Sequence, residues 1–170
     1  MFFLRTGVAL GRNLELVLKL LTPGNRLVAR VMLCTGLRVG DVVGLTRDQI
    51  RPALSVTEAK TGKRRRVRIP QALCDEVLKA AGRGRWAFPS PSDPAKHRTR
   101  QAVWADIKRA QRACRLRANL GTHSMRKAYA VRLMGKYHDL ARVQRALGHE
   151  RPEVTLIYAM ADQLMGRAGR

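Results

Sequence analysis

Acidic residues are scarce in this chain, which has 12 Asp and Glu against 34 Lys and Arg among its 170 residues. The few acids are scattered and form no run with the spacing of metal ligands. A nuclease that works through divalent metal ions needs carboxylates to hold them, so this class is not favoured. The formal charge of +22 instead favours a polyanionic partner, with nucleic acid first and an anionic membrane second.

Other patterns are also missing. Cys34, Cys74 and Cys114 are spaced too widely for a zinc site or a compact disulfide framework, which indicates reduced thiols. The chain has no glycine-rich phosphate loop of the G-x-x-x-x-G-K-[ST] kind. It also lacks an apolar run that could cross a membrane, and Arg5 interrupts the apolar start before it could form a secretion signal. We therefore expect a cytoplasmic protein without a membrane partner.

The basic residues gather in two stretches, residues 60–68 and residues 96–117. Apolar residues recur between the cations in both, as Val67 and Ile69 do in the first. A disordered basic arm would lack this regular apolar spacing. Both stretches are therefore predicted to be basic faces of folded elements.

Apolar periodicity predicts one mostly helical α+β domain with a small antiparallel sheet. The sheet is expected to be a hairpin with strands around residues 54–56 and 67–69, and residues 86–88 are a candidate for a further short strand. Helices are predicted in the segments where apolar positions recur at helical spacing, which are residues 14–21, 25–35, 73–81, 101–115, 124–134 and 140–147, and after Pro152.

Turn and cap residues locate the ends of these helices. Gly36 and Gly148 are well placed to end the helices before them, and Asp139 is placed to begin the helix over residues 140–147. Arg38 and His149 are therefore expected just beyond helix ends.

Six residues form an ordered set although each is ordinary by itself: Arg38, Lys60, His123, Arg126, His149 and Tyr158. A lone arginine after a helix is favoured by the helix dipole, and a lone tyrosine is most often a half-buried core residue. Their conjunction is informative, because three cations, two imidazoles and one phenol suit attack on a phosphodiester. Such attack adds negative charge to the phosphate oxygens in the transition state, which fixed cations stabilise.

The same positions resemble the sequence boxes of the tyrosine recombinases, the phage integrase family. Residues 35–41, Thr-Gly-Leu-Arg-Val-Gly-Asp, resemble the first arginine box, whose acidic position is commonly Glu. Residues 59–63, Ala-Lys-Thr-Gly-Lys, resemble the hairpin that carries the family's lysine, and residues 122–126, Thr-His-Ser-Met-Arg, resemble the second box. Residues 147–158, which run from Leu-Gly-His to a tyrosine, resemble the third. The resemblance covers roughly residues 22–160.

This resemblance implies a site-specific DNA recombinase or integrase that cleaves and rejoins DNA through a 3′-phosphotyrosyl intermediate on Tyr158. Arg38 and Arg126 would clamp the non-bridging phosphate oxygens, and His123 and His149 would add donors. The covalent intermediate keeps the bond energy for rejoining. We therefore expect no cofactor, neither ATP nor a metal ion.

The resemblance also implies that Lys60 protonates the leaving 5′ oxygen, and Lys63 is the alternative because a hairpin tip could present either lysine. The expected partners are double-stranded DNA and further copies of the chain, which in this family form a tetrameric synapse, at the nucleoid. The cations expected to contact DNA are Lys63, Arg64, Arg65, Arg66, Lys96, Arg98 and Arg100.

Three divisions of the chain are expected: a helical lead-in over residues 1–21, the catalytic domain over residues 22–160 and a tail over residues 161–170. The family's usual N-terminal core-binding domain is expected to be absent. Two other functions share these residues. One is an accessory DNA-binding factor that has lost catalysis, and the other is a nicking and resealing enzyme of the type IB topoisomerase kind.

Overall fold

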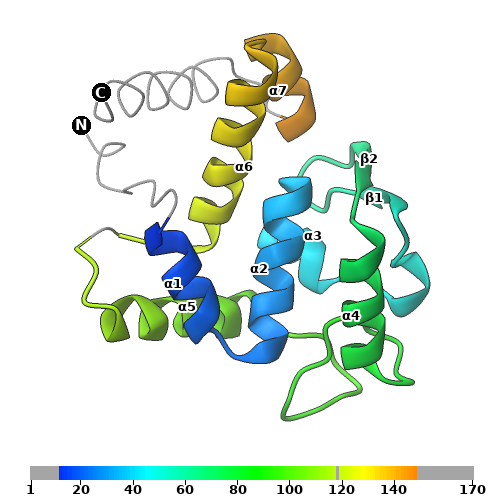
Figure 1. Cartoon of the computed structure of the whole chain (residues 1–170). Helices are drawn as coiled ribbons and strands as arrows, with labels where there is room; N and C mark the ends of the chain where they lie inside the picture. Colours follow the sequence, from blue (N-terminus) through cyan, green and yellow to red (C-terminus); the bar gives the residue numbers. More distant parts are fainter. Residues whose placement is uncertain (1–11, 118, 149–170) are drawn as a thin grey trace.

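The computed structural model describes residues 12–117 and 119–148 (Figure 1). Seven α-helices, one 3-10 helix and two strands follow one another in these residues. Their bounds in chain order are α1 Arg12–Leu20, α2 Pro23–Thr35, α3 Val39–Val43, the 3-10 helix η2 Arg47–Gln49, β1 Ala53–Thr57, β2 Arg64–Arg68, α4 Gln71–Ala81, α5 Arg100–Ala113, α6 Thr122–Tyr137 and α7 Leu140–Leu147. The expected mostly helical α+β class is confirmed.

Helix α2 is the centre of the fold and packs against α1, α3, α4, α5, α6 and β2 (Figure 1). Pro23 stands at its start, where a missing N–H costs no hydrogen bond. Val28, Val31 and Met32 line its buried face at helical spacing. As predicted, α2 ends at Gly36, which has φ 64° and donates its N–H to Met32 O.

The predicted hairpin is confirmed as the antiparallel pair β1 and β2, in which Leu54 is opposite Val67 and both are buried. Every second residue of a strand faces the same side, so Arg64, Arg66 and Arg68 share the outer face. The expected strand at residues 86–88 is only an isolated bridge between Trp86 and Thr46. Pro89 follows at once and has no N–H with which to extend a ladder.

The hydrophobic core has two parts. The main cluster takes side chains from α1 to α6, and it includes Leu14 and Val17 of α1. A smaller cluster joins the second half of α6 to α7 through Ala130, Val143 and Leu147. Helix α7 therefore rests on α6 rather than on the main core, and its position depends on the hydrogen bonds described below.

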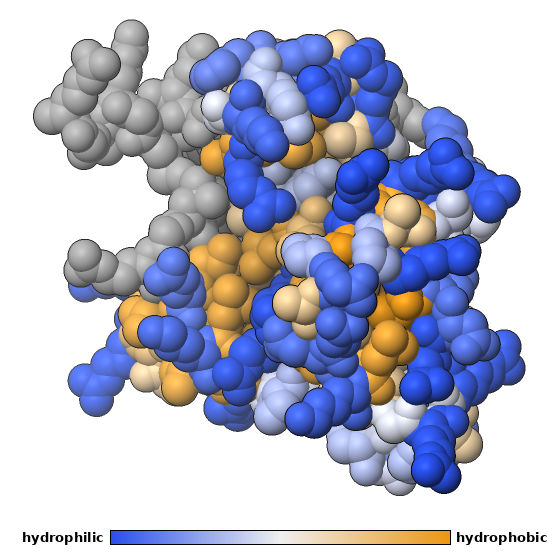
Figure 2. Space-filling view, turned by 45° about the vertical axis from the view of Figure 1, so that its right-hand side comes forward, coloured by the Kyte–Doolittle hydropathy of each residue, from blue (hydrophilic) through white to orange (hydrophobic). Residues whose placement is uncertain are grey.

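The ends of α7 agree with the sequence. The Asp139 carboxylate accepts a hydrogen bond of 3.0 Å from the Arg142 N–H, and Gly148 ends the helix with φ 62°. Much of the face in Figure 2 is hydrophilic, in keeping with the excess of charged residues. Within the described ranges, no helix is long and apolar enough to cross a membrane.

Candidate active site

Four of the six predicted catalytic residues line one pocket of about 360 Å³: Arg38, Lys60, His123 and Arg126. They come from the α2–α3 junction, the hairpin turn and the first turns of α6. Arg100, at the start of α5, lines the same pocket. The structure therefore brings together residues that are far apart in the sequence. His149 and Tyr158 lie outside the described residues.

Arg38 is placed by the turn between α2 and α3. Gly36 leaves α2 in a left-handed conformation, and a Cβ there would lie 2.3 Å from Cδ1 of Tyr129 on α6. The chain passes close beneath α6 at this point, and the extended Arg38 begins α3. The Arg38 side chain is 24% exposed, which leaves it accessible from the pocket.

The Arg38 guanidinium donates a hydrogen bond of 2.5 Å to Oε2 of Glu58. Glu58 has no exposed surface and also accepts from Arg65 at 2.7 Å and from the Thr61 hydroxyl at 3.0 Å. Burial by itself would raise the pKa of Glu58, but these donors outweigh it and the pKa lies below 4.5. Glu58 is therefore a charged carboxylate between two arginines.

Lys60 is held by the backbone of the hairpin turn. The Ala59 N–H donates to Oδ1 of Asp41 at 3.0 Å, which ties the residue before Lys60 to α3. The N–H of Gly62 returns to the Glu58 carbonyl at 2.8 Å and closes the turn. Lys60 lines the pocket, and Lys63 is not among the residues that do. This geometry favours Lys60 over Lys63 as the proton donor.

His123 is the second residue of α6, where its ring points into the pocket region from a helix start. Partial burial lowers the pKa of His123 below 6.5, and the positive charges of Arg126, Lys127, Arg38 and Lys60 lower it further. At neutral pH the imidazole is therefore neutral, with one nitrogen able to donate and the other able to accept.

Arg126 is 4% exposed and bonds to two helix ends. Its guanidinium donates to the carbonyl of Gly36 at 2.6 Å, beyond α2, and to the carbonyl of Leu147, at the end of α7. Helix C-termini carry partial negative charge, so the contacts are favourable. Arg126 thus holds α7, and with it the start of the segment that leads to His149 and Tyr158, against the pocket.

The cations predicted to contact DNA fall into two groups, those with exposed side chains and those that bond within the fold. Arg64 and Arg66 are exposed on the outer face of β2, and Lys96 is exposed beside Asp93 at 3.0 Å. Lys63 is also exposed at the hairpin turn.

Arg65 and Arg98 are half-buried and bond to groups of the fold instead. Arg65 bonds to Glu58 and to the carbonyls of Thr35 and Ala146. Arg98 donates to Asn25 Oδ1 at 3.1 Å, and burial lowers its pKa. Both guanidiniums therefore have partners within the fold, and their contact with DNA stays a prediction.

Three residues of note, Glu58, Arg51 and Arg68, were not among the predicted site residues. Glu58 is the only acid between Asp48 and Asp75, and a lone acid in so basic a stretch could have signalled its role. Arg51 and Arg68 are exposed beside Arg64 and Arg66 and line a second hollow with them. We call these four residues the arginine ladder. The cross-strand neighbours of its strand members are Ala53, Ser55 and Thr57, so none faces an acid.

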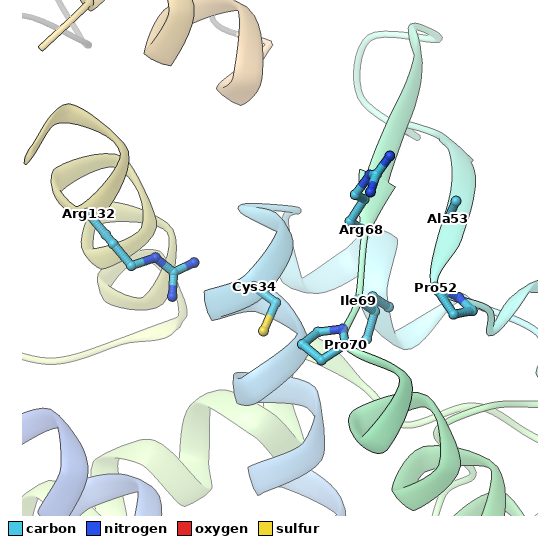
Figure 3. Close-up of a pocket in the computed structure, with 7 residues that line it drawn as sticks. All are labelled: Cys34, Pro52, Ala53, Arg68, Ile69, Pro70 and Arg132. Carbon is cyan, nitrogen blue, oxygen red and sulfur yellow. The ribbon is translucent and has the colours of Figure 1, made fainter. Parts of the chain in front are cut away.

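A further pocket, of about 560 Å³, lies between the end of α2, the base of the hairpin and α6 (Figure 3). Cys34, Ile69 and Pro70 form its apolar part, and Arg68 and Arg132 flank it. It contains none of the predicted catalytic residues. In residues 12–117 and 119–148, no group of three His, Cys, Asp or Glu side chains could hold a metal ion.

Comparison with known proteins shows which family this chain belongs to. The profile of the phage integrase family matches residues 15–164. The integrase of Escherichia phage P2 is 29% identical over 155 residues, which cover 91% of this chain and 43% of that integrase. Tyrosine recombinase XerD of Lacticaseibacillus casei is 30% identical over 144 residues, which cover 79% of this chain and 49% of XerD. The chain therefore spans less than half the length of either relative.

Solved structures agree on the fold. The XerH site-specific recombinase bound to a palindromic difH substrate superposes with a TM-score of 0.73 at 21% identity, over 93% of this chain and 51% of XerH. The catalytic domain of bacteriophage HP1 integrase superposes with a TM-score of 0.64 at 23% identity, over 88% of this chain and 84% of that domain.

The fold is the helical α+β fold of tyrosine recombinase catalytic domains, and in this chain it brings four of the predicted catalytic residues into one pocket. The chain belongs to the phage integrase family, and the resemblance seen in the sequence boxes is confirmed.

Proposed function

We propose that this chain carries the catalytic domain of a site-specific DNA recombinase that cleaves and rejoins DNA through Tyr158. The observation that carries the proposal is the pocket that joins Arg38, Lys60, His123 and Arg126. These four residues lie in three separate sequence boxes, and the fold brings them to one pocket. Their convergence is the arrangement that a pentacoordinate phosphate requires.

The reaction is a transesterification. The Tyr158 oxygen attacks the phosphorus, a tyrosyl–phosphate bond forms, and the bond from phosphorus to the 5′ oxygen breaks. Lys60 supplies the proton that the departing 5′ oxygen takes up. Rejoining reverses these steps with a 5′ hydroxyl as the attacking group. Bonds broken and formed balance, so the exchange consumes no nucleotide.

The cations of the pocket act on the charge that develops at the phosphate. Arg38 and Arg126 stay protonated at any working pH and offer planar pairs of N–H groups. His123 is neutral at pH 7 because of its lowered pKa, so it suits either a hydrogen bond to phosphate or acceptance of the tyrosine proton. His149 is proposed to add a further donor.

Double-stranded DNA is the proposed substrate, with its backbone held by the arginine ladder and by Lys63, Lys96 and Arg100. Solved structures of relatives include complexes with DNA, among them a lambda integrase dimer bound to a COC' core site. Further copies of the chain are proposed to assemble on the DNA, as a tetramer if two duplexes exchange strands. A cytoplasmic location at the nucleoid follows from this substrate.

The proposed catalytic domain comprises residues 22–160, and residues 161–170 are proposed to form a tail. Residues 1–21 lead into this domain, and α1 adds Leu14 and Val17 to the main core. The relatives are about twice as long, so contacts made by their remaining parts are proposed to add to DNA affinity.

The test uses the full chain and a pool of short duplexes of random sequence, each nicked so that a cleaved fragment diffuses away. A covalent protein–DNA adduct that survives denaturation is expected with the wild-type chain and is absent with Tyr158→Phe. Sequencing the trapped DNA reveals the target.

Three other outcomes overturn the proposal. DNA binding without an adduct indicates an accessory factor that lacks catalysis. Relaxation of supercoiled plasmid without strand exchange indicates a nicking and resealing enzyme of the topoisomerase kind. Retention of the adduct in Tyr158→Phe would place the nucleophile elsewhere.

A further inference from the structure

We propose that Glu58 is a positioning residue of this active site, which aims the Arg38 guanidinium at the scissile phosphate and ties it to the end of α7. The inference rests on the proposed function. Glu58 belongs to none of the sequence boxes, and it lines no wall of the catalytic pocket. It acts through the two arginines that it binds.

The contacts of Glu58 leave it little freedom. Its two carboxylate oxygens are divided between the arginines, with Oε2 2.5 Å from Nη1 of Arg38 and Oε1 2.7 Å from Nη1 of Arg65. The Thr61 hydroxyl donates to Oε2 at 3.0 Å. Its backbone N–H donates to the Lys63 carbonyl at 3.0 Å, so the turn that carries Lys60 is closed on Glu58 itself.

A buried carboxylate of this kind fixes an arginine more firmly than solvent does. Glu58 has no exposed surface, whereas the Arg38 side chain is 24% exposed and reaches the pocket. One N–H of Arg38 is bound to Glu58, and the planar guanidinium then has a defined orientation for its remaining donors. An arginine without this partner would sample several rotamers, and each would misplace its donors relative to phosphate.

The second arginine extends the effect to α7. Arg65 donates from Nη2 to the carbonyl of Thr35 at 3.2 Å and to the carbonyl of Ala146. A Cβ on Gly148 would lie 3.4 Å from Oε1 of Glu58, so the end of α7 passes directly over this carboxylate. Glu58 therefore connects Arg38, the Lys60 turn and the helix that leads to the remaining two site residues.

The overall charge stays suited to phosphate. Arg38, Arg65, Lys60 and Arg126 surround this region with positive charge, and Glu58 cancels only one of these. A second buried carboxylate in this part of the fold, Asp41, accepts a hydrogen bond from the Ala59 N–H, whereas the ion pair of Arg38 among the described residues is with Glu58. The orientation of Arg38 thus depends on Glu58 among the described residues.

The experiment measures single-turnover cleavage of the trapped target by the wild-type chain, Glu58→Gln and Asp106→Asn. Glu58→Gln keeps the side-chain size but removes the charge that holds Arg38, and we expect cleavage to fall by about 100-fold with DNA affinity changed less than about 3-fold. Asp106→Asn alters a buried carboxylate that does not line the pocket and binds at the start of α2, and it is expected to cleave at the wild-type rate when folded.

A second substrate separates positioning from general damage. A methylphosphonate at the scissile position carries no negative charge, so an aimed guanidinium contributes less to its cleavage. On this substrate the loss of cleavage rate in Glu58→Gln is therefore expected to be less than about 10-fold, because the variant mainly loses the stabilisation of phosphate charge by Arg38. Equal losses on both substrates, or wild-type cleavage by Glu58→Gln, overturn the inference.

Failure of the proposed function looks different, because the wild-type chain then forms no adduct on either substrate. If circular dichroism shows that Glu58→Gln does not fold, Glu58→Asp is tested on the phosphate and the methylphosphonate substrates in its place. Its carboxylate is one methylene short of spanning both arginines, so a smaller loss with the same preference for the charged phosphate is expected.

Discussion

Two buried carboxylates, Asp106 and Glu58, lie near opposite ends of helix α2. Asp106 on α5 accepts hydrogen bonds at the N-terminal end of α2, from the N–H and hydroxyl of Thr22 and from the Asn25 amide, and pairs with Arg109. Glu58 lies near the C-terminal end, where its partner Arg65 also binds the Thr35 carbonyl. Both carboxylates have a lowered pKa, because their hydrogen-bond donors outweigh the effect of burial.

The difference between them lies in their surroundings. A carboxylate at a helix N-terminus is stabilised by the dipole and by free N–H groups, so Asp106 completes a cap and needs one arginine. A carboxylate near a helix C-terminus is opposed by the dipole, so Glu58 needs two arginines, and one of these faces the pocket. Similar chemistry thus supports the fold at one end of α2 and, under the proposed function, the catalytic pocket at the other.

The largest expected effect on cleavage is that of Arg38→Ala, and removal of the arginine at the other end of α2 serves as its control. Arg38→Ala is expected to lower single-turnover cleavage by about 100- to 1000-fold, the loss typical of one preorganised donor group. Arg109→Ala removes the partner of Asp106 and is expected to cleave within about 3-fold of the wild type. Quenched-flow measurement of the covalent adduct checks both. Near wild-type cleavage by Arg38→Ala would show that the pocket is not the active site.

Asp106→Ala tests the other end of α2. It leaves the Thr22 and Asn25 donors and the Arg109 charge without their acceptor, and we expect the free energy of unfolding in urea to fall by about 3 kcal/mol. The exposed Asp75→Ala on α4 is the control and is expected to change it by less than about 0.5 kcal/mol. Equal values for the two variants would mean that Asp106 does not stabilise the fold.

Acid titration compares both ends in one experiment. The pKa values of Glu58 and Asp106 lie below their ordinary values of 4.5 and 3.8 in the folded chain. Above these ordinary values their full stabilisation is present. As the pH falls toward the lowered values, the unfolded chain binds protons first and the free energy of unfolding decreases.

Urea unfolding between pH 6 and pH 3 is therefore expected to show a shallower loss of stability in Glu58→Gln and in Asp106→Asn than in the wild type. The double variant is expected to be shallower still, because the two carboxylates are well separated. A wild-type slope in either single variant would show that its carboxylate takes up no extra proton in that window.

The smallest effect separates the inward arginine of β2 from its outward neighbours. Arg66→Ala and Arg68→Ala, two members of the arginine ladder, are each expected to reduce the slope of log affinity against log salt by about 0.9, the value for one lost phosphate contact. Arg65→Lys changes the partner of Glu58 and is expected to leave this slope unchanged. A reduced slope for Arg65→Lys, measured by fluorescence anisotropy, would mean that Arg65 reaches DNA after all.

The sequence predicted the elements well because their signals are local. The helical spacing of Val28 and Met32, the caps at Gly36 and Gly148 and the alternation in β2 each depend on neighbouring residues alone. Residues 86–88 were less predictable, because a strand needs a partner and Pro89 limits the one available to a single bridge.

Within the candidate site, the motif residues could be proposed from their order, but their supports could not. Arg65 and Arg66 are adjacent and chemically identical, yet one binds Glu58 and the other faces outward. The pleat of a strand sends neighbours to opposite sides, and only the packing of β2 on α2 decides which side is inside.

The amino-acid sequence alone determined the family, the helices, the hairpin and the residues that carry the proposed chemistry, because these depend on residue types at fixed spacing. The tertiary structure decided that Arg38, Lys60, His123 and Arg126 share a pocket and that Glu58 lies behind Arg38. The shared pocket and the position of Glu58 depend on which helix ends pack against one another. A buried charge is stable only where this packing supplies groups that pair with it.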